Sequence, residues 1–217
     1  MTFETQSVEI LHEDEAIVVI DKPPGMIVHP APGHETGAVT DILVKRFPQM
    51  AGVGSQERPG VVHRLDIETS GVMVFAKTQR AYLDLRRQFE SHKTVEKTYL
   101  AVLHGAPKVK SGTIDEPVGR DRLNAVTHWR TLGRHDGISL VEFKIDTGRM
   151  HQIRIHAAKL GCPVVGDRTY GSAEKDRHMR RRPSRLLLHA VKLSFIHPAT
   201  GRRVAFTAPP PNDIVFA

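Results

Sequence analysis

The chain has 217 residues, 40% of them hydrophobic and 25% charged, a composition that excludes a wholly disordered or membrane-embedded protein. No apolar run approaches the roughly 20 residues of a transmembrane helix, and residues 1–10 lack the features of a signal peptide, so we expect a cytoplasmic protein with no membrane contact. Basic residues outnumber acidic ones, 31 against 24, and the formal charge of +7 favours a polyanionic partner.

In chain order, alternating and β-branched runs predict strands over Val8–Leu11, Ala16–Ile20, Gly71–Ala76, Thr98–Leu103, Ser139–Ile145, Leu186–Phe195 and Arg203–Thr207. Helical patterns are present at Ala38–Phe47, Gln79–Ser91 and Met150–Leu160. Polar or turn-forming residues predict loops at Pro30–Thr36 and Gly171–Ser184. Because strands outnumber helices and do not alternate regularly with them, the predicted fold class is α+β, with a mixed, mainly antiparallel sheet flanked by helices.

Two basic stretches carry much of the positive charge. They are Arg80, Arg86, Arg87, Lys93 and Lys97, and then Arg177, Arg180, Arg181, Arg182 and Arg185. Nucleic acid is the polyanion that such clusters favour, while either stretch alone is also typical of a solvated surface. Cys162 is the only cysteine, so an intramolecular disulfide is excluded, and we expect it to be a small buried residue.

A short polar segment, His-Arg-Leu-Asp-Ile-Glu-Thr-Ser-Gly from His63 to Gly71, lies directly before a predicted strand. A loop at a strand edge can present an arginine and a carboxylate, here Arg64 and Asp66, into a cleft. The same residue types also form ordinary turns. On the residues alone, both interpretations stay open.

The segment that opens the third predicted helix is also rich in polar groups. Arg149, His151 and Arg154 at a helix start could hold an anion or a carboxylate. His151 and His156 are five residues apart, not the four of a metal-binding helix, so no metal site is expected there. Tyr99 in a predicted strand is, by itself, typical of packing.

Ordered motifs extend over roughly residues 8 to 210. They are Asp21–Gly25 with His29–Pro30, His63–Asp66 with Thr69–Gly71, Lys97–Tyr99, Gly148–Arg154 with His156, Gly166–Gly171, Leu186–Ala190, and His197–Pro198 with Gly201. In content and order they resemble the motifs of the large-subunit RNA pseudouridine synthase A family.

The resemblance implies the pseudouridine synthase catalytic fold, with residues 1–217 as one domain whose two lobes flank a central cleft. It implies a member without the separate N-terminal RNA-binding module of many relatives. Such a protein isomerises specific uridines to pseudouridine in ribosomal or transfer RNA stem-loops, or in both. Because substrate and product are isomers, we expect the protein to need no cofactor, and we expect no metal. We also expect a monomer.

The resemblance also implies the catalytic residues. Asp66 matches the essential aspartate, Tyr99 the tyrosine that packs on the base, and Arg154 the arginine that pairs with the aspartate. A carboxylate can attack C1′ as a nucleophile or remove a sugar proton as a base, and the sequence leaves both routes open.

For substrate binding, the resemblance implies Arg64 and His63 of the aspartate motif, with Arg64 filling the space that a flipped uracil leaves. Leu187 or Leu188 matches an apolar residue that lines the pocket.

Two other functions remain as alternatives. One is a catalytically idle RNA-binding protein. The other is a nucleoside or glycoside hydrolase that uses Asp66, for which Glu68 and Asp167 are the nearby candidates for a second carboxylate.

Overall fold

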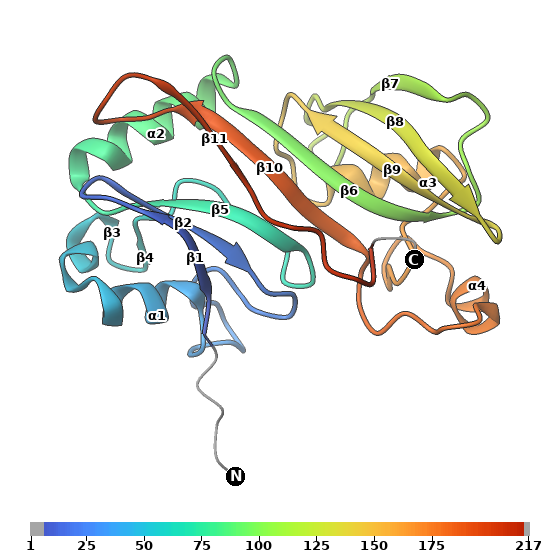
Figure 1. Cartoon of the computed structure of the whole chain (residues 1–217), viewed down its shortest axis with the longest axis horizontal. Helices are drawn as coiled ribbons and strands as arrows, with labels where there is room; N and C mark the ends of the chain where they lie inside the picture. Colours follow the sequence, from blue (N-terminus) through green and yellow to red (C-terminus); the bar gives the residue numbers. More distant parts are fainter. Residues whose placement is uncertain (1–6, 215–217) are drawn as a thin grey trace, which may run out of the picture. The chain divides into compact units, whose positions relative to one another are not determined.

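The computed structural model describes residues 7–214, which fall into two compact units (Figure 1). The first unit comprises the chain up to Val95 together with Lys192–Ala208. The second comprises Glu96–Val191 together with the segment from Pro209. Strand β10 (Leu188–Ile196) crosses the boundary and contributes to both units.

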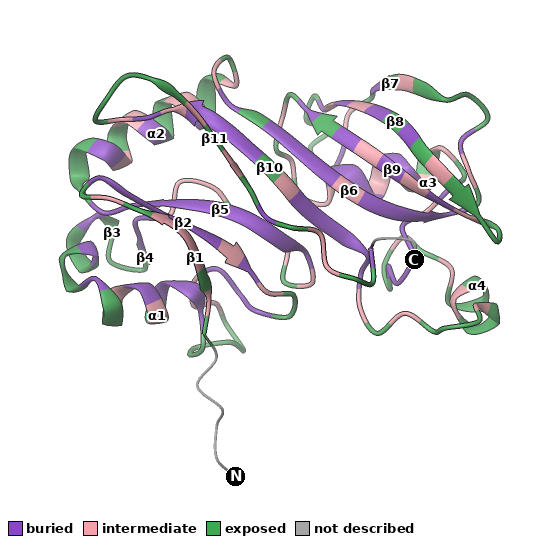
Figure 2. Ribbon diagram, viewed as in Figure 1, coloured by how far each residue is buried: buried purple, intermediate pink, exposed green. Residues whose placement is uncertain are grey.

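The first unit contains a sheet with the strand order β1-β2-β5-β10, and β11 pairs with β10. The strands other than β10 are β1 (Glu9–Glu13), β2 (Ile17–Lys22), β5 (Ser70–Ala76) and β11 (Arg203–Thr207). The β1–β2, β2–β5 and β10–β11 pairs are antiparallel. Every residue of β5 is buried, as expected for a continuous apolar run in the interior of a sheet (Figure 2).

Two helices, one 3₁₀ helix and a small hairpin complete the first unit. They are α1 (Val39–Arg46), η1 (Pro48–Gly52), β3 (Gly54–Ser55) paired with β4 (Arg58–Pro59), and α2 (Gln79–Ser91). Helix α2 begins where the Thr78 side chain accepts a hydrogen bond from the Ala81 N–H. Ala81, Leu85 and Phe89, spaced by four residues, are its buried face.

The second unit has the strand order β10-β6-β9-β8-β7. Its elements are β6 (Glu96–His104), β7 (Ser111–Asp115), β8 (Val126–His135), β9 (Ile138–Ile145), α3 (Gln152–Lys159) and α4 (Ala173–His178). Strands β8 and β9 are joined by Asp136 and Gly137, both with positive φ (44° and 76°), as the twist of a tight hairpin favours. Buried Val102, Val165, Leu187 and Ile214 form a core cluster in this unit.

The predicted α+β class with a mainly antiparallel sheet is confirmed, and all the predicted strands and helices are present with small shifts at their ends. The structure adds strands β7 and β8 and the short hairpin of β3 and β4, none of which was predicted from the sequence. The prediction of a continuous loop over Gly171–Ser184 was wrong, because α4 lies inside it. Cys162 is buried, as expected. No helix in the described part of the chain is long and apolar enough to span a membrane.

Candidate active site

His63, Arg64 and Asp66 all lie in the first unit, in the segment that leads into β5. Asp66 is half-buried, and its backbone carbonyl oxygen accepts a hydrogen bond from the Thr69 N–H at 3.1 Å. The two interpretations of this segment are therefore compatible: it is a turn, and the turn carries a half-buried carboxylate.

The turn is fixed by Lys22, the last residue of β2, whose side chain is fully buried. Its ammonium donates hydrogen bonds to three backbone carbonyl oxygens at 2.9–3.0 Å, one of them that of Ile67. The Ile67 carbonyl oxygen also accepts from the Gly25 N–H at 2.8 Å. Because Ile67 follows Asp66, these bonds connect the Asp-Lys-Pro-Pro-Gly motif to the aspartate motif. This role of Lys22 was not predicted from the sequence, although a lysine at the end of an apolar strand is a signal for it.

The two other motif residues in the first unit differ in their environment. The Nε2 atom of His63 accepts a hydrogen bond from the Val74 N–H (3.1 Å), and its ring stacks on Phe89 with centroids 4.5 Å apart. Arg64 is exposed and makes no hydrogen bond or ion pair within residues 7–214. His63 is therefore engaged with its own unit, while the Arg64 guanidinium is open to a ligand.

Tyr99 lies in the middle of β6 in the second unit and is 9% exposed. The strand register places it opposite Phe143 of β9, which in turn lies opposite Trp129 of β8. Helix α3 covers this face of the sheet, since His156 Nδ1 lies 2.8 Å from the hydroxyl of Thr127, two residues before Trp129 (Figure 1). Tyr99 is therefore part of an aromatic row on the side of the sheet that α3 packs against.

Arg154 of α3 is buried and forms a bidentate ion pair with Asp167. Its Nε donates to one carboxylate oxygen at 2.7 Å, and its Nη2 donates to the other at 2.8 Å. The guanidinium also lies over the Tyr170 ring, 5.2 Å from the centroid. Burial acts to raise the pKa of Asp167, but Arg154 and the N–H groups of Tyr170 and Thr169 hold it below its usual value. Asp167 and Tyr170 thus fix the orientation of Arg154.

The segment before α3 is also fixed by hydrogen bonds. His151 adopts the left-handed conformation (φ 57°), so the helix begins at Gln152 and not at Met150. The Gln152 side-chain oxygen accepts from the Thr147 hydroxyl (2.7 Å) and the Arg149 N–H (3.1 Å). His151 Nδ1 lies 3.1 Å from the Tyr170 hydroxyl.

The two candidate pocket leucines are both buried but have different surroundings. Leu187 belongs to the core cluster with Val102, Val165 and Ile214. Leu188 is the first residue of β10. Because successive residues of an extended chain point to opposite faces, the Leu188 side chain points away from the side on which Leu187 packs.

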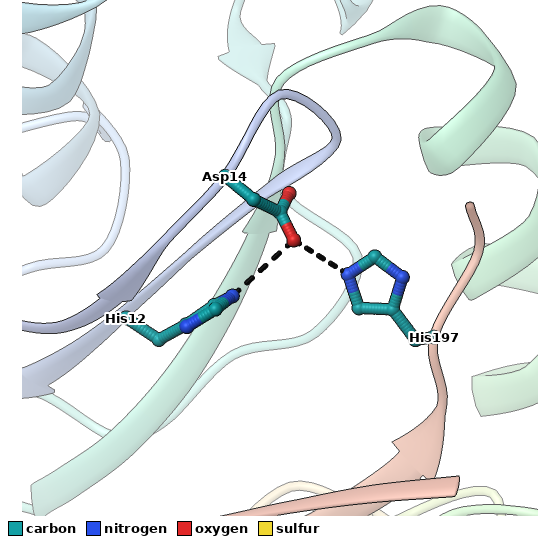
Figure 3. Close-up of side chains that lie close together, drawn as sticks. All are labelled: His12, Asp14 and His197. Atoms are coloured by element: carbon teal, nitrogen blue, oxygen red, sulfur yellow. Dashed lines mark hydrogen bonds and ion pairs between the residues drawn. The ribbon is translucent and has the colours of Figure 1, made fainter. Parts of the chain in front are cut away.

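One group in the described part of the chain has the spacing of a metal site: His12, Asp14 and His197, with ligand atoms within 4.8 Å of one another (Figure 3). The Nδ1 atom of His197 accepts from the Ala199 and Thr200 N–H groups, so its proton is on Nε2, which donates to Asp14 at 2.7 Å. A metal ion would need that Nε2 without its proton. The hydrogen bonds therefore favour a structural network over a metal site.

The same network explains the state of Asp14. Burial acts to raise its pKa, but hydrogen bonds from the Ile17 and Ala16 N–H groups and from His12 and His197 bring it down to about 2. The carboxylate thus joins the β1–β2 turn to the turn between β10 and β11.

The residues of the two basic stretches are largely exposed, but two of them differ from the expected exposed, unpaired cations. Lys97 is only 8% exposed and is not a surface cation. Arg185 forms a bidentate ion pair with Asp213 at 2.6 and 2.8 Å. In the second stretch, α4 is fixed to β6 by the hydrogen bond between His104 and Asp176 (2.6 Å).

The fold is that of solved RNA pseudouridylate synthase domains. Human RNA pseudouridylate synthase domain containing 4 matches with a TM-score of 0.78 and 26% identity, covering 95% of this chain and 90% of that one. Human RNA pseudouridylate synthase domain containing 1 matches with a TM-score of 0.75 and 26% identity, covering 96% and 86%. The class of protein is therefore a pseudouridylate synthase domain.

Sequence comparison identifies the family. Residues 16–159 match the family described as RNA pseudouridylate synthase. An uncharacterized RNA pseudouridine synthase of Synechocystis sp. is 42% identical over 94% of this chain and 65% of its own length. One of Bacillus subtilis is 40% identical over 97% and 72%, and the ribosomal large subunit pseudouridine synthase D of Zymomonas mobilis is 38% identical over 95% and 70%. This chain belongs to the RNA pseudouridylate synthase family, a family of isomerases.

The chain spans about two thirds of the length of these relatives. His63, Arg64 and Asp66 belong to the first unit, and Tyr99 and Arg154 to the second. The pairing of Asp66 with Arg154 therefore stays a prediction.

Proposed function

We propose that this chain isomerises specific uridines to pseudouridine in structured RNA, with Asp66 as the catalytic carboxylate. The observation that carries this proposal is family membership over most of the chain, together with a turn that presents Asp66 half-buried just before β5. No feature of the described residues favours the idle RNA-binding alternative. The hydrolase alternative loses one of its two second carboxylates, because Asp167 is bound to Arg154.

For the chemistry, we propose that Arg154 pairs with Asp66. A neighbouring guanidinium favours the charged form of a carboxylate. The charged form is required whether Asp66 attacks C1′ or removes a sugar proton. Asp167 and Tyr170 support this role, because they fix the orientation of Arg154.

For substrate binding, we propose that Tyr99 packs on the target uracil and that Leu188 lines the pocket. Leu187 is committed to the core cluster, which leaves Leu188 as the better candidate. Exposed Arg64 inserts into the space that the flipped base leaves and offsets part of the unstacking cost, a few kcal/mol. His63 acts through packing, since its ring holds the segment against α2 and β5.

We further propose ribosomal RNA of the large subunit as the first RNA to test, with transfer RNA second. Relatives from Zymomonas mobilis and Xanthomonas campestris are named ribosomal large subunit pseudouridine synthase D. The exposed arginines of the second basic stretch are suited to phosphate contacts, each of which adds about 0.7–0.9 to the salt slope of binding.

The test is tritium release from RNA labelled at uridine C5. Wild type should release tritium, and Asp66→Asn should bind the RNA but release none. Glu68→Gln, which removes a half-buried carboxylate from the same turn, is the matched control and should stay active. Free uracil that still carries the C5 label, without tritium release by wild type, would favour the hydrolase. RNA binding by wild type without release from any RNA would favour the idle protein.

A further inference from the structure

Lys97 is a buried cation for which the chemistry described so far has no use. Its side chain, 8% exposed, has one hydrogen-bond acceptor in the described part of the chain, the Thr147 carbonyl oxygen at 3.3 Å. No carboxylate lies within ion-pairing distance of it among residues 7–214. An ammonium has three N–H donors, and burying it with a single long bond is costly. Such a group is suited to a ligand that supplies the missing acceptors.

The position of Lys97 indicates which ligand this is. Lys97 and Tyr99 are two residues apart in β6, so their side chains emerge on the same face, roughly 6.6 Å apart along the strand. This is the face that α3 covers, and the Lys97 ammonium lies beside the segment that leads into α3. Gly148 of that segment is close to it, because a Cβ added there would lie 3.5 Å from the ammonium, in van der Waals contact. A base packed on Tyr99 therefore has the Lys97 ammonium close to its edge.

We propose that Lys97 is a further catalytic residue, which donates a charge-assisted hydrogen bond to a carbonyl oxygen of the target uracil. This inference rests on the proposed function, because it needs a uracil on Tyr99. Lys97 is then the group that stabilises the base while the base is detached from the sugar.

The reaction creates the charge that Lys97 would meet. When the N1–C1′ bond breaks, its electron pair stays with the uracil ring and is shared between N1 and the two carbonyl oxygens. The ring then turns, C5 bonds to C1′, the C5 proton is lost and N1 takes up a proton, so substrate and product are isomers. Lys97 keeps its proton throughout. A donor aimed at charge that develops during the reaction lowers the barrier more than it strengthens substrate binding.

The charge state of Lys97 fits this role. Burial lowers its pKa to about 8, while Asp146 acts to raise it and Arg149 to lower it further. Tyr99 is the other titratable group on the same face of the strand. At neutral pH the lysine is therefore mostly charged, and a developing negative charge on the base strengthens its hold on the proton.

The test measures single-turnover pseudouridine formation and RNA affinity for three variants. Lys97→Met removes the charge at similar volume, and Lys97→Arg keeps a charge that does not titrate. Lys144→Met is the control, because Lys144 is exposed on neighbouring β9 opposite Thr98. We expect Lys97→Met to lower the rate constant about 100-fold to 1,000-fold at saturating RNA and to leave the affinity nearly unchanged. Lys97→Arg should recover part of the rate, and Lys144→Met should behave as wild type.

The pH profile separates catalysis from a purely structural role. The wild-type rate constant should fall as the pH rises past the lysine pKa, and this fall should be absent in Lys97→Met and Lys97→Arg. Ionisation of the base itself affects all variants equally. A wild-type rate constant that stays flat through this pH range refutes the proposal even if a variant fails to fold.

Three results would overturn the proposal: full activity of Lys97→Met, a flat wild-type profile, or a loss of RNA affinity with an unchanged rate constant. The last would make Lys97 a phosphate contact. A wild type that forms no pseudouridine at all would instead refute the proposed function.

Discussion

The buried pair between Arg154 and Asp167 allows a quantitative prediction. Both side chains are almost fully buried, and the pair has two short charge-assisted hydrogen bonds. Removing one partner of such a pair leaves the other charge buried without its partner, at a cost of about 3–5 kcal/mol. For a chain of this size, each kcal/mol corresponds to about 2–4 °C in Tm, so Arg154→Met should lower Tm by roughly 6–20 °C.

The assay is thermal unfolding of Arg154→Met, Asp167→Asn and the double variant at pH 7. The double variant should fall short of the sum of the single losses by roughly 0.5–3 kcal/mol, because neither charge of the Arg154–Asp167 pair is left buried without the other. Exposed Arg168, next to Asp167, is the control, and Arg168→Met should stay within about 0.5 kcal/mol of wild type. An unchanged Tm in Arg154→Met, or fully additive losses, would refute the reasoning.

The pH dependence of this pair has a definite sign. The pKa of Asp167 is lower in the folded protein than its ordinary value of 3.8, so the unfolded chain binds the proton more tightly. The stabilisation is complete above pH 3.8 and is lost as the pH falls through the lower, folded-state pKa. The difference in stability between wild type and Arg154→Met should therefore be constant near neutrality and shrink in acid.

Three further predictions follow from single residues. Arg64→Ala should lose more turnover on folded RNA than on short single strands; equal losses in a steady-state assay would contradict base flipping by Arg64. Lys97→Met should raise the free energy of unfolding at pH 7 by up to about 3 kcal/mol, because the folded pKa of about 8 lies below the ordinary 10.5. That gain should fade between those two pH values, and urea unfolding at pH 7 and pH 10 checks both points. Gly166→Ala should destabilise the second unit, since Gly166 has φ +77° and an added Cβ would overlap the Arg185 carbonyl oxygen. A melting temperature equal to that of wild type would contradict this last prediction.

The elements that the sequence predicted well are those whose local signals agree. Helix α2 has a capping threonine at Thr78 and apolar residues at spacing four, and its predicted bounds match the structure. Strand β5 is a continuous apolar run next to a turn, and it is buried throughout. Here the local pattern and the tertiary environment require the same structure.

Strand β8 was missed because its buried face carries Thr127 and Thr131 beside Trp129. Threonine gives only a weak apolar signal, and the burial of Thr127 depends on His156 from α3, which is distant in sequence. Helix α4 has no buried residue to reveal it, and its position depends on the hydrogen bond between Asp176 and His104.

The sequence by itself determined the family, the fold class and the chemical types at the candidate site, because these depend on ordered short motifs and local periodicity. Only the tertiary structure decided what each charged residue contacts. Lys22 fixes the turn that carries Asp66, Asp167 orients Arg154, and Lys97 is buried and not part of a surface patch. The physical reason is that a lysine, an arginine or an aspartate has the same sequence signature in water and in a core. Its energetic role depends on desolvation and on hydrogen-bond partners that are distant along the chain.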